Sequence, residues 1–239
     1  MLARAFTSAV VGLEPRRVEV EAHLVSADLP AFSIVGLADR ACQEAKHRVH
    51  SAIVNAMLPW PERHRITVNL APAGLRKEGS GFDLPIALAL LAGSHQLPPA
   101  RLLEHGCVGE LSLDGRVRPV AGTIAVAEGA RRAGLTLLLC AAESAPEAAL
   151  AGINVVPVRH LAEAVAYLRG EEHIEFAQPP GSDELESRSC RISLRCAVRS
   201  GGVARSSSPL QVSTTSCSRA HPARERRCSD AAFRAYCRR

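Results

Sequence analysis

A charged, glycine-rich loop carries the side chains of this 239-residue sequence that are best spaced for chemistry. Lys77, Glu78, Ser80 and Asp83 fall within seven positions, directly ahead of the apolar segment 84–92. Backbone N–H groups at the start of a helix can hold an anion, so the loop is a candidate anion site. The same spacing also suits a packed loop in which Ser80 caps the helix and Asp83 completes a capping box. Both interpretations remain open from the sequence.

The segments around this loop predict one α+β domain. Alternating apolar residues indicate strands at 3–10, 16–25, 31–35 and 65–70, and apolar residues at spacings of three and four indicate a helix at 39–57. The same patterns predict helices at 82–91, 121–133, 143–151 and 161–168, and strands at 108–113, 116–120, 135–140 and 154–158. We expect the early strands to form an antiparallel sheet covered by helices.

Other reactive side chains favour structural interpretations. Cys42 and Cys140 lie on apolar faces, which predicts core thiols, and no pair of cysteines has metal-ligand spacing, so we expect no metal site. The nine histidines are scattered, and His47 and His50 on one helix are expected to be solvated. Two basic pairs could contact phosphate but are interpreted as surface charge: Arg16-Arg17 and Arg131-Arg132.

The composition limits the class of protein. Hydrophobic residues make up 47% of the chain and aromatic residues only 3%, which predicts a core built mostly from Ala, Val, Leu and Ile. The longest apolar stretches are too short to span a bilayer. The first residues lack the pattern of a secretory signal. We therefore expect a soluble, cytoplasmic protein with no membrane partner.

Four strings of residues together resemble one family. They are Ile34–Asp39 (IVGLAD), Val68–Ala73 (VNLAPA), Lys77–Pro85 (KEGSGFDLP) and Gly109–Gly115 (GELSLDG). In this order they resemble the N-terminal domain of ComM/YifB proteins, which are magnesium-chelatase-like AAA+ ATPases, over about residues 1–175. The resemblance implies the ribosomal protein S5 domain 2-like fold, a two-layer sandwich found also in the peptidase domain of Lon and in RadA.

The same resemblance implies an ATPase module after this domain. In intact relatives the cofactors would be ATP and Mg, and the partners would be that module and neighbouring subunits of a homo-hexamer. ComM members are implicated in natural transformation, as motors that move branched DNA, so DNA is a further expected partner. A subunit of a true magnesium chelatase for tetrapyrroles is an alternative, although its motor subunits typically lack this N-terminal domain.

The likeness to Lon raises a second alternative, a Ser-Lys peptidase, whose serine must be activated by a nearby neutral lysine. Lon-type enzymes carry the string KDGPSAG at the start of the helix. The segment that resembles it places Gly81 at the nucleophile position and Ser80 one residue early. The Lon general base would fall near Ile124, where the sequence has no lysine. We therefore expect no catalytic residue in this domain.

Beyond about residue 180 the sequence changes character and becomes rich in Ser, Arg, Pro and Cys. Five of the eight cysteines lie there: Cys190, Cys196, Cys217, Cys228 and Cys237. Three interpretations compete, namely an arginine-rich nucleic-acid-binding tail, a disordered linker, or coding sequence read in a displaced frame. Codon arithmetic can test the last of these.

A shift of one nucleotide converts part of the tail into a phosphate-binding loop. If each true codon starts one base earlier, residues 220–229 can be read as GPPGAGKTML. This is a Walker A pattern, whose glycines let N–H groups cradle phosphates and whose Lys and Thr serve phosphate and magnesium. The displaced loop lies over Ala220, His221, Pro222, Ala223, Arg224, Glu225, Arg226 and Arg227. The same shift gives DLSEVRGQVRRRRALELAAAGVHNLLL over residues 191–218 and LPGILP over residues 233–238.

Agreement over most of the tail, in one frame and in the family's order, favours a change of reading frame near residues 180–190. We therefore expect an N-terminal domain at 1–175 and a disordered, out-of-frame tail at 183–239. The chain as written should bind no nucleotide, because no residue of it forms a phosphate loop.

Overall fold

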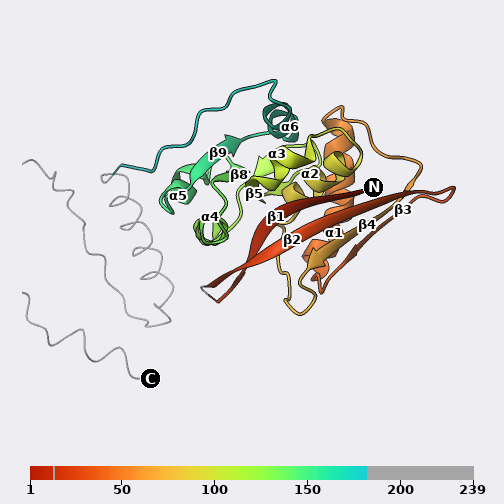
Figure 1. Ribbon diagram of the computed structural model, residues 1–239, viewed down its shortest axis with the longest axis horizontal. Coiled ribbons are helices and arrows are strands. Elements are labelled where there is room, and N and C mark those ends of the chain that lie inside the picture. Colours follow the sequence, from red (N-terminus) through yellow and green to blue (C-terminus); the bar gives the residue numbers. More distant parts are fainter. Residues whose placement is uncertain (13, 182–239) are drawn as a thin grey trace, which may run out of the picture. The chain divides into compact units, whose positions relative to one another are not determined.

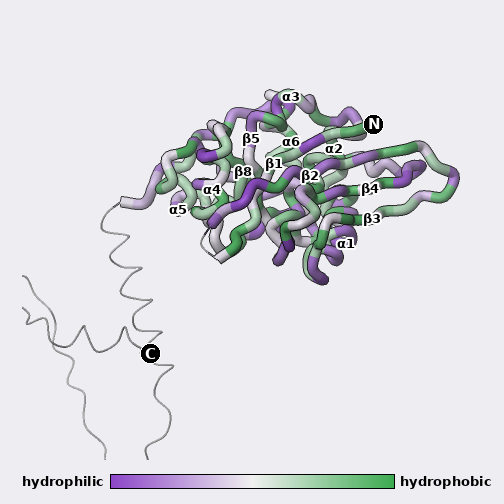
Figure 2. Tube along the Cα trace, turned by 60° about the horizontal axis from the view of Figure 1, so that its bottom comes forward, coloured by the Kyte–Doolittle hydropathy of each residue, from purple (hydrophilic) through white to green (hydrophobic). Residues whose placement is uncertain are grey.

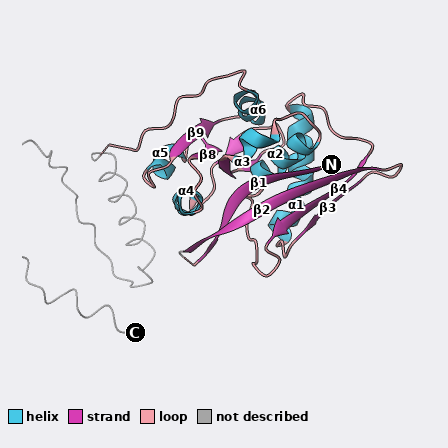
Figure 3. Cartoon of the chain, in the orientation of Figure 1, coloured by secondary structure: helices cyan, strands magenta, loops and turns pink. Residues whose placement is uncertain are grey.

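The computed structural model describes residues 1–12 and 14–181. A seven-stranded sheet with the order β3-β4-β2-β1-β5-β8-β9 forms its centre, and β6 and β7 form a separate two-stranded ribbon (Figures 1 and 3). The strands are β1 (Leu2–Val11), β2 (Glu14–Ser26), β3 (Ala31–Val35), β4 (His64–Ala71), β5 (His105–Val108), β6 (Glu110–Leu111), β7 (Val117–Arg118), β8 (Leu137–Ala141) and β9 (Asn154–Val158). The helices are α1 (Arg40–Asn55), α2 (Asp83–Gly93), α3 (Pro99–Leu103), α4 (Thr123–Arg132), α5 (Ala145–Ala149) and α6 (Leu161–Arg169).

The structure confirms the predicted combination of helices and strands. The sheet is mixed, however, where an antiparallel sheet of the early strands was expected. Strand β2 pairs antiparallel with both β1 and β4, as expected for the early strands. Strand β3 instead pairs parallel with β4, and β1, β5, β8 and β9 are parallel neighbours. The reason is connectivity, because α1, α4 and α5 each follow one strand and return the chain to the same end of the sheet before the next parallel strand.

Helices α1 and α2 cover one face of the antiparallel half of the sheet. Hydrophilic and hydrophobic residues alternate along β2 and β4, as expected for strands with one covered and one open face (Figure 2). Helix α2 is different, because every residue from Asp83 to Gly93 is buried. It contacts β1 and β2 and also α1 and α3, so it is the central helix of the domain.

Helices lie on both faces of the sheet at its other end. In β8, Leu139 and Ala141 join the main core, while Leu138 and Cys140 join a second cluster with residues of α4 and α5. The predicted two-layer arrangement therefore describes the β3-β4-β2-β1 half, and the parallel end carries an additional helical layer. The expected core thiols are confirmed, since Cys42 and Cys140 are fully buried, and burial raises the pKa of Cys42 to about 12.

Two local predictions were incomplete. The sequence analysis missed α3 and most of β5, and it predicted one strand over 108–113 where the structure has the end of β5 and the short β6. The cause lies at Gly109, whose N–H donates to the carbonyl of Gly81 and whose carbonyl accepts from Leu84, so the chain leaves the sheet there. Within the described part of the chain, no helix combines the length and the apolar character needed to cross a membrane.

A buried histidine joins three elements at the parallel end. His105 of β5 is 1% exposed; its Nδ1 lies 2.7 Å from the carbonyl oxygen of Arg101, and its Nε2 lies 3.3 Å from the hydroxyl of Tyr167. These distances fit a neutral ring that donates to Arg101 and accepts from Tyr167. Burial lowers the pKa of His105 below its ordinary value.

This histidine should make the domain less stable in mild acid. The unfolded chain binds a proton near the ordinary histidine pKa of about 6.5, whereas the folded chain resists protonation to lower pH. The free energy of unfolding should therefore fall as pH drops through about 6.5. Denaturant unfolding of wild type and His105→Gln at about pH 7.5 and about pH 5.5 measures this, with a smaller loss expected for the variant. Equal losses in the two proteins would contradict the assignment.

Candidate functional site

The charged loop is held against the start of α1. Asp39 is the N-cap of that helix, and its carboxylate accepts the N–H of Cys42 at 2.7 Å and the N–H of Gly79 at 3.0 Å. The backbone N–H of Asp39 donates to the carbonyl of Lys77, and the N–H of Lys77 donates to the carbonyl of Leu37. The strings Ile34–Asp39 and Lys77–Pro85 therefore form one hydrogen-bonded unit.

The two remaining strings join the same unit. Gly36 has φ +105°, and a Cβ atom there would lie 2.3 Å from the carbonyl oxygen of Leu70, so only glycine fits. This contact connects the first string to Val68–Ala73. The backbone hydrogen bonds of Gly109 to Gly81 and Leu84 connect the third string to Gly109–Gly115. All four strings that carry the family resemblance thus meet around the loop.

Asp83 provides the strongest polar contact of this region. Its carboxylate has no exposed surface, yet it accepts two hydrogen bonds from Arg48 of α1, from Nε at 2.6 Å and from Nη2 at 2.9 Å. It also accepts the N–H of Leu111 in β6 at 3.2 Å. Burial raises the pKa of Asp83 and Arg48 opposes that rise, while the hydrogen bonds that Arg48 donates to Asp83 raise the pKa of Arg48. The geometry is that of an ionised, bidentate pair.

The predicted cap at Ser80 is wrong. The N-cap of α2 is Phe82, whose side chain cannot accept a hydrogen bond, and the hydroxyl of Ser80 donates to the carboxylate of Glu110 instead. In a cap the Ser80 oxygen would accept a backbone N–H, whereas here its hydroxyl donates to a carboxylate that β6 places within reach. Asp83 likewise belongs to the buried ion pair and completes no capping box.

The four candidate residues do not converge on one centre. Lys77 is fully buried, its ammonium donates to the carbonyl of Pro72, and burial lowers its pKa. Glu78 is exposed and pairs with Arg76 at 2.9 Å. Only Glu78 and Ser80 of the four reach a common surface, while Lys77 and Asp83 hold the loop from beneath.

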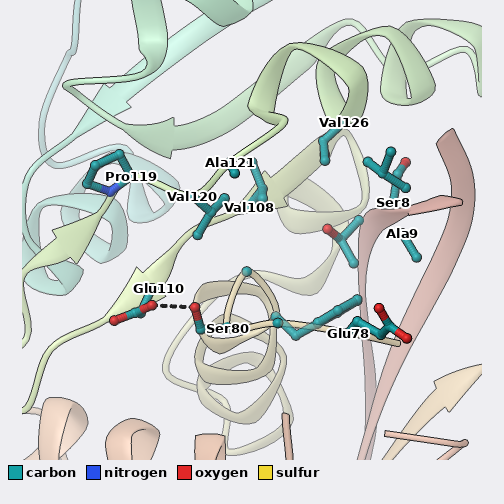
Figure 4. A pocket seen from close by; sticks show the side chains of 15 residues that line it. Ser8, Ala9, Glu78, Ser80, Val108, Glu110, Pro119, Val120, Ala121 and Val126 are labelled. Carbon is teal, nitrogen blue, oxygen red and sulfur yellow. Dashed lines mark hydrogen bonds between the residues drawn. The ribbon is translucent and has the colours of Figure 1, made fainter. Parts of the chain in front are cut away.

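That surface is a groove of about 470 Å³ between the loop, β1 and the segment before α4. Figure 4 shows Ser80 and Glu78 at its base, Ser8 and Ala9 on the β1 side, and Pro119, Val120 and Ala121 on the opposite side. Its lining residues are Thr7, Ser8, Ala9, Val10, Glu78, Gly79, Ser80, Gly81, Phe82, Val108, Glu110, Pro119, Val120, Ala121 and Val126. Its volume lies in the range of small-ligand pockets.

The groove contains Gly81, the expected position of a Lon-type nucleophile, but Ile124, near the expected position of the Lon base, is not among its lining residues. Gly81, at the expected nucleophile position, faces the side chains of Val108 and Val120. Among the described residues that line the groove, none is Lys, Arg or His. Ser80 therefore has a carboxylate beside it and lacks the basic nitrogen that would activate its hydroxyl.

Several contributing residues cannot be predicted from the sequence. Glu110 falls within a family string, Arg48 is one residue of a predicted helix, and Ser8 is one residue of a predicted strand. No local pattern connects them to the loop, since the Ser80–Glu110 and Arg48–Asp83 contacts join positions 30 and 35 residues apart. The displaced Walker A positions, 220–227, lie outside the described residues.

Comparison with known proteins identifies the family. The family model described as subunit ChlI of Mg-chelatase matches residues 18–144. The chain is 38% identical over 178 residues to the uncharacterized protein YifB of Escherichia coli, covering 74% of this chain and 35% of that protein. It is 40% identical over 177 residues to the competence protein ComM of Haemophilus influenzae, covering 74% of this chain and 34% of that protein.

The chain, whose described part folds as a mixed sheet with a loop fixed ahead of a buried helix, belongs to this ChlI family. Within it, the chain is a protein of the ComM/YifB type. It spans about a third of the length of these relatives. A weaker match, 29% identical over 148 residues, is to the Lon protease of Brevibacillus choshinensis, covering 57% of this chain and 19% of that protein.

Removing one partner of the buried ion pair should destabilise the domain strongly. Asp83→Ala leaves the Arg48 guanidinium without its carboxylate, and such losses typically cost about 3–5 kcal/mol. Chemical denaturation of the full chain measures the change. Glu44→Ala is the matched control on α1, because its pair with Arg40 is exposed and should contribute at most about 1 kcal/mol. Equal effects of the two substitutions would show that the Arg48–Asp83 pair does not hold the loop.

Proposed function

We propose that this domain is the non-catalytic N-terminal domain of a magnesium-chelatase-like AAA+ ATPase of the ComM/YifB type. In the intact protein it serves the motor in the cytoplasm, through contacts with neighbouring subunits of a homo-hexamer and with DNA during competence and DNA processing. The observation that carries the non-catalytic assignment is the groove, in which Gly81 stands at the expected nucleophile position and no Lys, Arg or His is among the described lining residues.

The contacts of Lys77 and Ser80 support this assignment against the peptidase alternative. The Lys77 ammonium donates to Pro72 beneath the loop, while the Ser80 hydroxyl donates to Glu110 in the groove. The two residues therefore belong to separate environments, and the Asp39–Gly79 hydrogen bond fixes the loop between them. Ile124, near the place of the Lon base, has a hydrocarbon side chain that cannot accept a proton.

The proposal assigns residues 183–239 to a displaced frame over the start of the ATPase module. It is supported by the Walker A pattern that one shifted frame produces over residues 220–227, with the family's flanking segments on both sides. Arg226 then stands where the loop lysine would be, and the residues as written cannot cradle phosphates. ATP and Mg are accordingly assigned to the intact protein and not to this chain.

Moving the frame back by one nucleotide near codons 180–190 should create ATP binding. The restored protein should bind a fluorescent ATP analogue saturably and in a Mg-dependent manner, because its Walker A backbone and lysine then contact the phosphates. The unrepaired chain should show no saturable binding in the same titration.

A repaired protein with its Walker A lysine replaced by alanine is the control, and it should lose most of the gained affinity. Saturable ATP binding by the unrepaired chain, or a repaired, folded protein that binds no nucleotide, would contradict the proposal.

A further inference from the structure

One edge of β1 borders the groove without a full partner strand. Met1 and Leu24 exchange two backbone hydrogen bonds, from N to O in each direction, at 2.7 and 2.9 Å. In an antiparallel pair such residues alternate along the strand, so the odd-numbered residues of β1 direct their N–H and C=O groups toward β2. The even-numbered residues direct theirs to the opposite side, toward β5 and the groove.

Strand β5 covers only part of that opposite edge. Among the described residues, the β1–β5 pairing consists of Phe6 with Gly106. Strand β5 ends at Val108, and the chain then turns away at Gly109 to bond with Gly81. Strand β1 continues to Val11, so the backbone groups of Val10 face the groove beyond the end of β5. This is an open strand edge inside a pocket.

The walls of the groove define what could pair with this edge. Val108, Val120 and Val126 supply aliphatic surface, and Glu78 and Glu110 supply two carboxylates, whose partners Arg76 and Arg118 are themselves largely exposed. The described lining holds no basic side chain of its own, so it offers a phosphate backbone no cation within the groove. An extended peptide fits both the open edge of β1 and the walls of the groove. Its main chain can pair with the strand edge, and its side chains can contact the valines and the two carboxylates.

We propose that the groove binds an extended peptide segment of a partner protein, which adds to the free edge of β1. The segment carries small aliphatic side chains for the valine-lined walls and a lysine or arginine for the carboxylates at positions 78 and 110. The peptide is held and is not cut, and in this respect the inference rests on the non-catalytic function proposed above.

The test uses the full chain and a probe labelled at its N-terminus, fluorescein-Arg-Val-Ala-Val-Arg-amide, in a fluorescence polarisation titration. Saturable binding is expected, and Val10→Pro should weaken it at least about tenfold, because proline removes the N–H that the peptide would use. Val10→Ala is the matched control, since it keeps that N–H, and its affinity should stay within about threefold of wild type. A probe N-methylated at alternate residues should also lose affinity.

Two further measurements keep the outcomes separate. Thermal unfolding of Val10→Pro should resemble that of wild type, because this N–H is not part of the β1–β2 ladder. If the variant fails to fold, Ala121→Trp is used in its place. The tryptophan side chain fills the groove and should likewise weaken binding. Mass spectrometry of the recovered probe should find it intact. Unchanged affinity in the proline and tryptophan variants, or no saturable binding to wild type, would overturn the docking inference. Cleavage of the bound probe would overturn the non-catalytic function while leaving the docking site in place.

Discussion

The Arg48–Asp83 ion pair is the contact on which the central part of this domain depends. Helix α2 is buried along its whole length, so a carboxylate in its first turn is tolerated only because Arg48 and the N–H of Leu111 supply three hydrogen bonds. Arg48 also donates to the carbonyl of Ala41. The pair therefore joins α1, α2 and β6, and it fixes where the loop ahead of α2 must run.

The contacts around the loop explain which residues of the four family strings the fold requires. Gly36 allows the first string to approach Leu70, Asp39 caps α1 and holds Gly79, and Gly109 bonds to both ends of the turn before α2. Each of these is a structural requirement, whereas among the side chains of the four strings Glu78, Ser80 and Glu110 present polar groups to the groove. The strings thus preserve a scaffold and the shape of a groove, without supplying the groups that would make it a peptidase.

Most of the helices and strands could be predicted from the sequence, because the spacing of apolar residues indicates which face of each element is buried. The prediction failed at Ser80, because the acceptor Glu110 lies 30 residues away in the sequence. Lys77 is one of the candidate residues of the loop, but its burial could not be predicted, since a charged residue in a glycine-rich loop suggests exposure and only the folded chain places it beneath that loop. The parallel pairing of β3 depends on the crossover through α1, which no local pattern records.

The proposed non-catalytic function depends on the lack of a basic side chain beside Ser80 among the described residues that line the groove. The most direct measurement is to incubate the full chain with a fluorophosphonate probe, which labels activated serines, and to determine its intact mass and the modified residue. The account predicts no adduct at Ser80, because its hydroxyl has a carboxylate partner and no basic nitrogen beside it. Stoichiometric labelling of Ser80 that is lost in Ser80→Ala, with the stability of the fold unchanged by that substitution, would contradict the account and place this domain among the peptidases.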